Sequence, residues 1–473
     1  MIHTPRAVAA IDLGATSGRV VLGRVGRGIL DTETVARFPN DPIRLGTGLH
    51  WDAAGLYAAS VHGLRDAFRR EPQIASIGVD SWAVDYALLR DGRLLGIPFH
   101  YRDERTARGV AAVETAIARD DLFARNGLQF LPFTTAYQLA AEPPELMATA
   151  DTLLLIPDLI AFWLTGARRA ELTNASTTGL LDARRRTWDD ELVSALRLPR
   201  TVLPPLIAPG ERIGELLPHV QASVGGTAPV IAVGSHDTAS AVVAVPMRAE
   251  AAAYISCGTW GLVGVEVAHP VLTPAVRAAN VTNEGGVDGR VRLLHNVMGL
   301  WILSEAVRGW SRDGGDVELA TLLAAAAQVP ASAAPVFDVD DPRFLAPGDM
   351  PARIDAWCDE HGATPPRTRA AYVRAIVESL AQAFADAVAT TSRLGGVDVR
   401  TVHLVGGGAL NELLCQRTAD RCGVPVVAGP VEATALGNVL IQARAAGVID
   451  GELEQLRDLV ARTQELRRYE PRA

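Results

Sequence analysis

One acidic residue stands where an apolar strand turns into an apolar helix. Asp237 lies in Val233–Ser240, in which the polar turn Ser-His-Asp-Thr separates the two apolar segments. An aspartate at such a place commonly caps the helix, because its carboxylate accepts hydrogen bonds from free N–H groups. It can also act as a general base toward an attacking hydroxyl. Two phosphate-type turns elsewhere in the chain favour the second role, because a transferred phosphoryl group needs an acceptor.

These two turns share glycines and hydroxyl side chains. The first, Asp12–Arg19 (DLGATSGR), follows a strand, and the second, Ser256–Gly261 (SCGTWG), lacks the acid. Glycine allows a ligand to approach the backbone, and successive N–H groups with hydroxyls form an anion cradle. Asp12 is suited to hold Mg²⁺, and Arg19 to neutralise phosphate charge. Each turn alone is typical of an ordinary hairpin; as a pair they predict a clamp on adjacent phosphates.

A third glycine-rich element is His403–Asn411 (HLVGGGALN), which runs from a strand into a helix. Three glycines let the chain lie flat against an adenine or ribose, with the helix N-terminus near the phosphates. Glycine runs also serve as plain turns and caps. The small residues of Glu432–Gly437 are interpreted as structural, since at a helix start they permit close packing on a sheet.

The elements that must position these residues alternate between strands and helices, which predicts an α/β architecture. The second phosphate turn repeats the strand, turn and strand of the first, so a duplicated fold is expected, with domains 1–242 and 243–473. A loop is expected over Pro330–Pro351, a helix over Thr368–Leu394, and a charged surface helix and tail from Leu453. The predicted strands are Ala7–Leu13, Gly18–Gly23, Ile74–Asp80, Pro229–Gly234, Ala252–Ser256 and Val402–Val405.

Composition narrows the class of protein. The 473 residues carry a net charge of -9 without runs of like charge, which argues against a nucleic-acid or anionic-membrane surface and favours a small-molecule partner. No signal peptide or membrane span is evident, so a cytoplasmic protein is expected. Four scattered cysteines predict free thiols. Monomer and dimer fit the sequence equally.

The chain contains no lysine, so all 45 basic residues are arginine. A Walker A loop and a protein kinase both need a lysine on the phosphates, and Schiff-base chemistry needs its amine. These mechanisms are therefore excluded.

In order and composition, these motifs resemble the FGGY family of carbohydrate kinases, over nearly the whole chain. The resemblance implies a duplicated actin-like, ribonuclease-H-like fold with two domains flanking a catalytic cleft. The more specific strings are VDSWAVDYALL (79–89), HYRDERT (100–106), LQFLPFTTAYQL (128–139), VTNEGGVDGR (281–290), NVMGLW (296–301) and DDPRFLAP (340–347).

The resemblance also implies an activity and a set of site residues. It implies phosphorylation of the C1 hydroxyl of a ketose, L-rhamnulose, by ATP and Mg²⁺, with Asp237 as the catalytic base and Asp12 as a possible metal ligand. The implied sugar site comprises Ala83, His236, Asp237, Thr238 and Asn296, and the implied ATP site comprises Ala15, Thr16, Ser17, Gly18, Arg19, Thr259 and Gly407.

Two positions depart from the family pattern, and several alternatives stay open. Ala83 stands where the family pattern has a glycine in a sugar-contacting stretch, and a nucleotide-side glutamine of the family is replaced near Ser304, so that role is not transferred. L-fuculose or xylulose are alternative acceptors, and an actin-like ATPase without a sugar acceptor is an alternative of another class. Trp51 and Trp82 are expected to pack in the core rather than stack on sugar.

Overall fold

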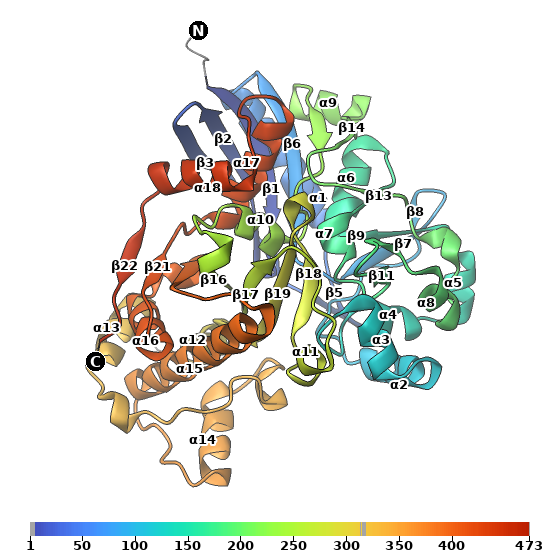
Figure 1. Ribbon diagram of the computed structural model, residues 1–473. Coiled ribbons are helices and arrows are strands. Elements are labelled where there is room, and N and C mark those ends of the chain that lie inside the picture. Colours follow the sequence, from blue (N-terminus) through green and yellow to red (C-terminus); the bar gives the residue numbers. More distant parts are fainter. Residues whose placement is uncertain (1–4, 313, 315–317, 473) are drawn as a thin grey trace. The chain divides into compact units, whose positions relative to one another are not determined.

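The computed structural model describes residues 5–312, 314 and 318–472. Its contacts divide the chain into two compact units. Unit 1 comprises Met1–Pro246, Val267–Leu293 and Ala433–Gln464, and unit 2 comprises Met247–Glu266, Leu294–Glu432 and Glu465–Ala473. The predicted boundary after residue 242 lies near the first crossing, but the chain returns to unit 1 twice. Each unit contains a large sheet with helices packed against it (Figure 1).

Unit 1 is built on a six-stranded sheet with the order β14-β15-β6-β1-β2-β3. β1 pairs with β2 in antiparallel and with β6 in parallel orientation, and β15 is parallel to β6. The carboxyl ends of three parallel strands therefore meet at one edge of the sheet. The strands are β1 (Arg6–Leu13), β2 (Ser17–Gly26), β3 (Ile29–Pro39), β6 (Ile74–Ser81), β14 (Arg212–Glu215) and β15 (Pro229–Ile231).

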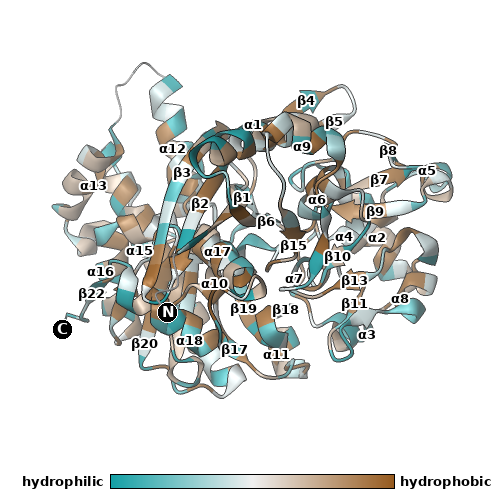
Figure 2. Cartoon of the chain, turned by 90° about the horizontal axis from the view of Figure 1, so that it is seen from above, coloured by the Kyte–Doolittle hydropathy of each residue, from teal (hydrophilic) through white to brown (hydrophobic). Residues whose placement is uncertain are grey.

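The central strands of this sheet are fully buried. Every residue of β1 beyond Arg6 is buried, whereas the edge strand β3 is mostly half-buried or exposed and carries hydrophilic residues (Figure 2). α1 (Ala53–Arg70) packs on β2 and β3, and α17 (Ala433–Ala445) packs on β1 and β6. Helices thus cover the strands whose ends carry the predicted site.

α17 also packs closely on α10 (Asp237–Val243). A Cβ atom on Gly437 would lie 1.8 Å from the backbone oxygen of Ser240. No side chain fits there, which explains the run of small residues at the start of α17. The structural interpretation of Glu432–Gly437 is confirmed.

The remaining helices and strands of unit 1 lie before β6, between β6 and β14, and after β15. They are β4 (Ile43–Leu45), β5 (Gly48–His50), β7 (Tyr86–Arg90), β8 (Arg93–Leu94), α2 (Thr106–Ala116), α3 (Arg119–Asn126), α4 (Thr135–Ala140), α5 (Pro144–Thr149), β9 (Thr152–Leu155), α6 (Ile156–Thr165), β10 (Ala170–Glu171), α7 (Leu172–Ala175), β11 (Leu181–Asp182), β12 (Thr187–Trp188), α8 (Asp190–Ala195), β13 (Leu206–Ile207), α9 (Pro218–Val224), α11 (Pro274–Ala278), β18 (Thr282–Gly285) and α18 (Leu453–Thr463).

Unit 2 repeats the plan of unit 1. Its strands follow the order β19-β17-β16-β20-β21-β22, and β16 is antiparallel to β17 and parallel to β20, as β1 is to β2 and β6. The predicted duplication is confirmed. Its elements are β16 (Ala252–Cys257), β17 (Trp260–Val267), α12 (Trp301–Arg312), α13 (Leu319–Ala327), α14 (Met350–Glu360), α15 (Arg369–Gly395), β20 (Thr401–Val405), α16 (Glu412–Cys422), β21 (Val426–Ala428) and β22 (Arg467–Tyr469). The strand β19 (Val291–Met298) is divided, because its residues up to Leu293 belong to unit 1 and those from Leu294 to unit 2.

The predicted helix over Thr368–Leu394 is confirmed as α15, whose N-cap is Thr368. The prediction of a plain C-terminal tail is wrong, because β22 pairs with β21 and extends the sheet of unit 2. α18 buries one apolar face with Leu456 and Val460 rather than lying wholly on the surface. The four cysteines are free, as predicted. Among the described helices, none has the length and apolar character that crossing a membrane would require.

Candidate active site

Asp237 is the first residue of α10 and follows the carboxyl end of β15. His236 occupies the N-cap position of α10, without a side-chain capping bond, so Asp237 is not the helix cap. Its side chain remains 29% exposed. Burial raises the pKa of this carboxyl, the adjacent His236 opposes the shift, and the negative charge of Asp12 adds to it. A carboxylate that is more basic than usual and still accessible is suited to accept a proton.

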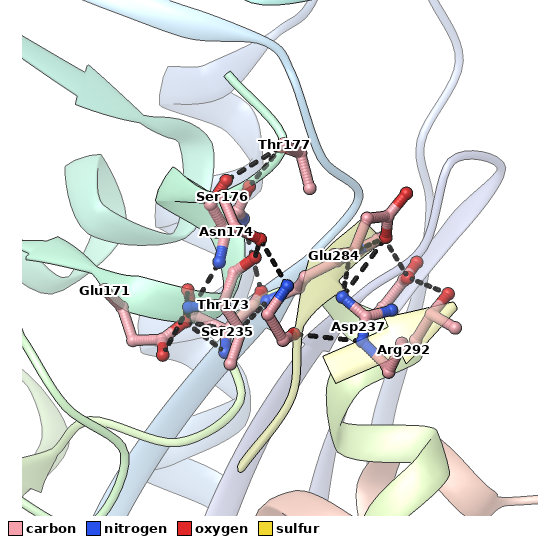
Figure 3. Close-up of polar contacts among 12 residues, drawn as sticks. Glu171, Thr173, Asn174, Ser176, Thr177, Ser235, Asp237, Glu284 and Arg292 are labelled. Atoms are coloured by element: carbon pink, nitrogen blue, oxygen red, sulfur yellow. Dashed lines mark hydrogen bonds and ion pairs between the residues drawn. The ribbon is translucent and has the colours of Figure 1, made fainter. Parts of the chain in front are cut away.

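The turn that precedes Asp237 is held by a buried glutamate. Glu171 is 1% exposed and accepts hydrogen bonds from the backbone N and Oγ of Ser235, at 2.9 and 2.8 Å (Figure 3). The same carboxylate caps α7 through the backbone N of Thr173, at 2.8 Å. These bonds fix the backbone from which Asp237 projects, because both partners are buried.

The first phosphate turn joins β1 to β2. Asp12 ends the strand, and its Oδ2 accepts hydrogen bonds from Nε and Nη2 of Arg19, at 2.8 and 2.5 Å. The turn is closed by the N–H of Gly14, which donates to the carbonyl of Ser17 at 2.9 Å. Asn40 fixes it from β3's end by donating to the carbonyl of Gly14 at 2.8 Å. Arg19 is thus oriented by Asp12 rather than extended freely toward a phosphate.

The donor set at this turn fits a magnesium ion held together with phosphates. Both bonds from Arg19 reach Oδ2 of Asp12, and the structure gives Oδ1 no hydrogen bond from a described residue. Mg²⁺ is usually held by one or two carboxylates, with water and phosphate oxygens completing its shell. Accordingly, the described residues contain no group of three or more metal-binding side chains.

Asp80 lies beside Asp12 on the neighbouring strand, since the two residues are register partners in the parallel pair β1 and β6. Asp80 is fully buried, and its Oδ2 accepts a hydrogen bond from Nδ2 of Asn438 at 2.5 Å. Burial and the charge of Asp12 raise its pKa well above the usual range. Asp80 therefore holds its proton more tightly than an ordinary aspartate does.

The second phosphate turn joins β16 to β17 in unit 2 and carries Thr259. The glycine triplet packs directly on it: a Cβ on Gly408 would lie 2.4 Å from Sγ of Cys257, whereas a Cβ on Gly407 would meet nothing within 4 Å. Gly299, from the string NVMGLW, approaches the other side, where a Cβ would lie 2.5 Å from the carbonyl carbon of Trp260. Two separate motifs thus converge on this turn.

Comparison with known proteins identifies the family. The model of the N-terminal domain of FGGY carbohydrate kinases matches residues 7–244, and that of the C-terminal domain matches residues 253–446. The chain belongs to the FGGY family of carbohydrate kinases. It is an enzyme that phosphorylates a sugar, which removes the alternative of an actin-like ATPase without a sugar acceptor.

Curated relatives of this FGGY kinase match it from end to end. A rhamnulokinase of Pectobacterium carotovorum subsp. carotovorum is 41% identical over 98% of this chain and 93% of its own length. A rhamnulokinase of Bacteroides thetaiotaomicron is 40% identical over 98% of this chain and 95% of its own.

Solved structures of the family share the duplicated actin-like, ribonuclease-H-like fold. The gluconate kinase of Lactobacillus acidophilus has a TM-score of 0.78 at 18% identity and covers 99% of this chain and 94% of its own. The xylulose kinase of Rhodospirillum rubrum has a TM-score of 0.77 at 21% identity, with the same coverage. The predicted fold class is confirmed.

Three of the family strings meet at one buried carboxylate, Asp85. Its Oδ2 accepts from the indole N–H groups of Trp51 and Trp82, at 2.5 and 3.0 Å, and from the backbone N of Tyr101 at 3.1 Å. Its Oδ1 accepts from Nε2 of Gln138 at 2.9 Å. Burial raises the pKa of Asp85 to about 6, and these bonds oppose the shift. This carboxylate joins three separate segments next to Ala83.

The structure separates the predicted site residues into two sets. Ala83, the Ala15–Arg19 turn and the triplet His236, Asp237 and Thr238 belong to unit 1, whereas Thr259, Asn296, Ser304 and Gly407 belong to unit 2. Within unit 1, Ala83 is half-buried and follows β6 directly. Trp51 is fully buried and Trp82 is 5% exposed, as the core interpretation predicts.

Proposed function

We propose that this FGGY kinase is a rhamnulokinase, which transfers the γ-phosphoryl group of ATP to the C1 hydroxyl of L-rhamnulose in rhamnose catabolism. The end-to-end similarity to curated rhamnulokinases supports the choice of substrate. The observation that carries the chemistry is the accessible carboxylate of Asp237, whose pKa is raised by burial at the end of β15.

In the proposed reaction, Asp237 takes the proton of the C1 hydroxyl as the new oxygen–phosphorus bond forms and ADP leaves. A base within hydrogen-bond reach of the acceptor contributes about 10²–10⁴-fold to such a step. Asp237 is positioned for this role because Glu171 fixes the preceding backbone through Ser235. His236 and Thr238 flank the carboxylate and, with Ala83 and Asn296, are the proposed sugar contacts.

Nucleotide-binding residues are proposed within each unit. Ala15, Thr16, Ser17, Gly18 and Arg19 of the first turn, with Thr259 of the second turn, would contact the phosphates. Gly407 would face the adenosine, and a Cβ there would enter open space. Asp12 would hold Mg²⁺ through Oδ1, and the bound ion would offset the charge of the phosphates.

The test is ADP release with MgATP across L-rhamnulose, L-fuculose, L-xylulose, D-xylulose and glycerol, with a control lacking sugar. We expect the highest kcat/KM with L-rhamnulose and no turnover without sugar. A preference for L-fuculose or xylulose would keep the kinase chemistry but reject the substrate, and would point to Ala83 as the altered contact. Equal ADP release with and without sugar would reject the proposed reaction.

A further inference from the structure

A row of buried charged side chains leads to Asp237 from β18 and β19. Arg292 of β19 is fully buried, and its Nη2 lies 3.1 Å from Nδ1 of His236 and 3.2 Å from Oε2 of Glu284 (Figure 3). Glu284 of β18 is 6% exposed, and its Oε2 lies 3.3 Å from the same Nδ1. On its other side, Nε2 of His236 lies 3.5 Å from Oδ1 of Asp237.

The two groups next to Nδ1 of His236 favour different tautomers: Arg292 is a hydrogen-bond donor, and the carboxylate of Glu284 is an acceptor. A guanidinium group is a pure donor that keeps its protons in proteins, so the N–H of Arg292 requires a lone pair on Nδ1 of His236. Glu284 does not need the histidine proton to offset its charge, because its Oε2 forms an ion pair with Nη2 of Arg292 at 3.2 Å. Only the tautomer with its proton on Nε2 avoids two opposed N–H groups.

Arg292 is itself held in place for this contact. Its Nε donates to the carbonyl of Gly285 at 3.0 Å, and it carries no exposed surface. A buried guanidinium with a bonded stem has little freedom to leave Nδ1. The orientation of the His236 ring is therefore fixed from the side opposite Asp237.

The consequence for Asp237 is that its two oxygens differ. Oδ1 accepts a hydrogen bond from Oγ1 of Thr238 at 3.0 Å and faces the N–H on Nε2 of His236. The structure gives Oδ2 no hydrogen bond from a described residue. A carboxylate oxygen that accepts one hydrogen bond and has a second N–H group 3.5 Å away is less basic than an oxygen with neither, because both groups stabilise its negative charge.

We propose that Arg292 is a positioning residue that fixes His236 as the Nε2–H tautomer and thereby leaves Oδ2 of Asp237 as the oxygen that receives the substrate proton. The second half of this proposal rests on the proposed function, whereas the tautomer does not. In the reaction, the proton passes from the sugar hydroxyl to Oδ2, the hydroxyl oxygen bonds to the γ-phosphorus, and the bond to the ADP oxygen breaks.

The tautomer is read directly by NMR of protein labelled with ¹⁵N-histidine, independently of any activity. We expect the His236 signals, assigned by their loss in His236→Gln, to show a protonated Nε2 and a bare Nδ1 at pH 8. Arg292→Met should move the proton to Nδ1, where Glu284 accepts it, while Arg292→Lys retains a donor and should keep Nε2–H. A wild-type signal with the proton on Nδ1 would overturn the proposal, whether or not the variants fold.

A matched pair of variants tests the effect on Asp237. The amide nitrogen of glutamine reaches the place of Nε2, and that of asparagine the place of Nδ1. We expect His236→Gln to retain a kcat/KM roughly tenfold or more above that of His236→Asn, at similar melting temperatures, because only glutamine can donate to Oδ1. Equal losses, or the opposite order, would reject the assignment of Oδ2. If Asp237→Asn also proved active, the proposed base would fail while the tautomer result would stand.

Discussion

The two hairpins that begin the two halves of the molecule share a topology but not a chemistry. The β1–β2 turn ends in a charged pair, Asp12 and Arg19, with Asp80 buried beside it. The β16–β17 turn has no acid and is enclosed by the glycine backbones of residues 299, 406 and 408. One copy of the duplicated unit thus acts through charge, and the other through the shape of its backbone. We therefore expect substitutions at the first turn to lower activity and substitutions at the second turn to lower stability.

The largest effect is expected from removing the charge of Asp237 in unit 1. Asp237→Asn should lower kcat by about 10²–10⁴-fold, because the base is lost while the side chain keeps its shape. ATP binding, measured by calorimetry, should stay close to wild type. In the wild-type enzyme, kcat/KM should fall on the acid side at a pH above the ordinary aspartate value of about 3.9, since burial raises this pKa. Near wild-type kcat in Asp237→Asn would contradict the assignment.

The next largest effect concerns Asp12, at the charged turn. Asp12→Asn should lower kcat/KM on the order of a hundredfold at low Mg²⁺, because the proposed cation loses its carboxylate. The measurement is a Mg²⁺ titration of activity, in which the half-saturating concentration should rise. The hydrogen bonds from Arg19 can be kept by the asparagine oxygen, so the melting temperature serves as the control. An unchanged Mg²⁺ dependence would remove Asp12 from the metal site.

In unit 2 the same kind of substitution should act on stability. Gly408→Ala places a methyl group 2.4 Å from Sγ of Cys257, and we expect a loss of about 1–3 kcal/mol in the free energy of unfolding. Gly407→Ala is the matched control, since its methyl group meets nothing within 4 Å. It should leave stability unchanged and raise KM for ATP. Equal stability of the two variants would show that the triplet is not tightly packed.

Asp80 in unit 1 tests how a buried carboxyl group beside Asp12 affects the pH dependence of stability. Its pKa is raised, so the folded state binds a proton more tightly than the unfolded state, and stability is lost as pH rises through the folded pKa. Asp80→Asn removes this loss and can still accept the bond from Asn438. The melting temperature of the variant, relative to wild type, should therefore increase with pH between 5 and 9, read by thermal unfolding in buffers of matched ionic strength. A constant difference would argue against the raised pKa.

The smallest effect is expected at Ala83. Ala83→Gly removes one methyl group near the proposed sugar site, and we expect it to alter discrimination by about tenfold, the low end of the effect of one such group in a binding pocket. The ratio of kcat/KM for L-rhamnulose and L-fuculose measures it. An unchanged ratio would mean that the contact is made by the backbone, and a larger change would make residue 83 a determinant of specificity.

The sequence predicted what depends on local patterns. Both hairpins, the glycine triplet and the strand-to-helix turn at Asp237 are short segments whose residue types reveal their backbone. The partners that complete the site were missed, because they come from elsewhere in the chain. Glu171 bonds Ser235 across 64 positions, and Asn438 bonds Asp80 across 358. No local pattern reports such pairs.

The role of Arg292 and the strand β22 were missed for a related reason. Arginine is mostly exposed in proteins, and only tertiary packing makes Arg292 fully buried. β22 is three residues long, and its charged sequence, Arg-Arg-Tyr, resembles a tail until its pairing with β21 is known. Glu284 lies in a family string, so its position could have been singled out, although its partner could not.

The contact between α10 and α17 gives the fold a mechanical property. Gly437 touches the backbone of Ser240 without an intervening side chain, and α10 begins with Asp237. α17 is also the first element after the chain leaves unit 2 at Glu432. Because this contact is made by backbone atoms, no change of side-chain rotamer can absorb a displacement of either helix. Any shift of α17 along its axis is therefore transmitted within unit 1 directly to α10, the helix that begins with the proposed base Asp237.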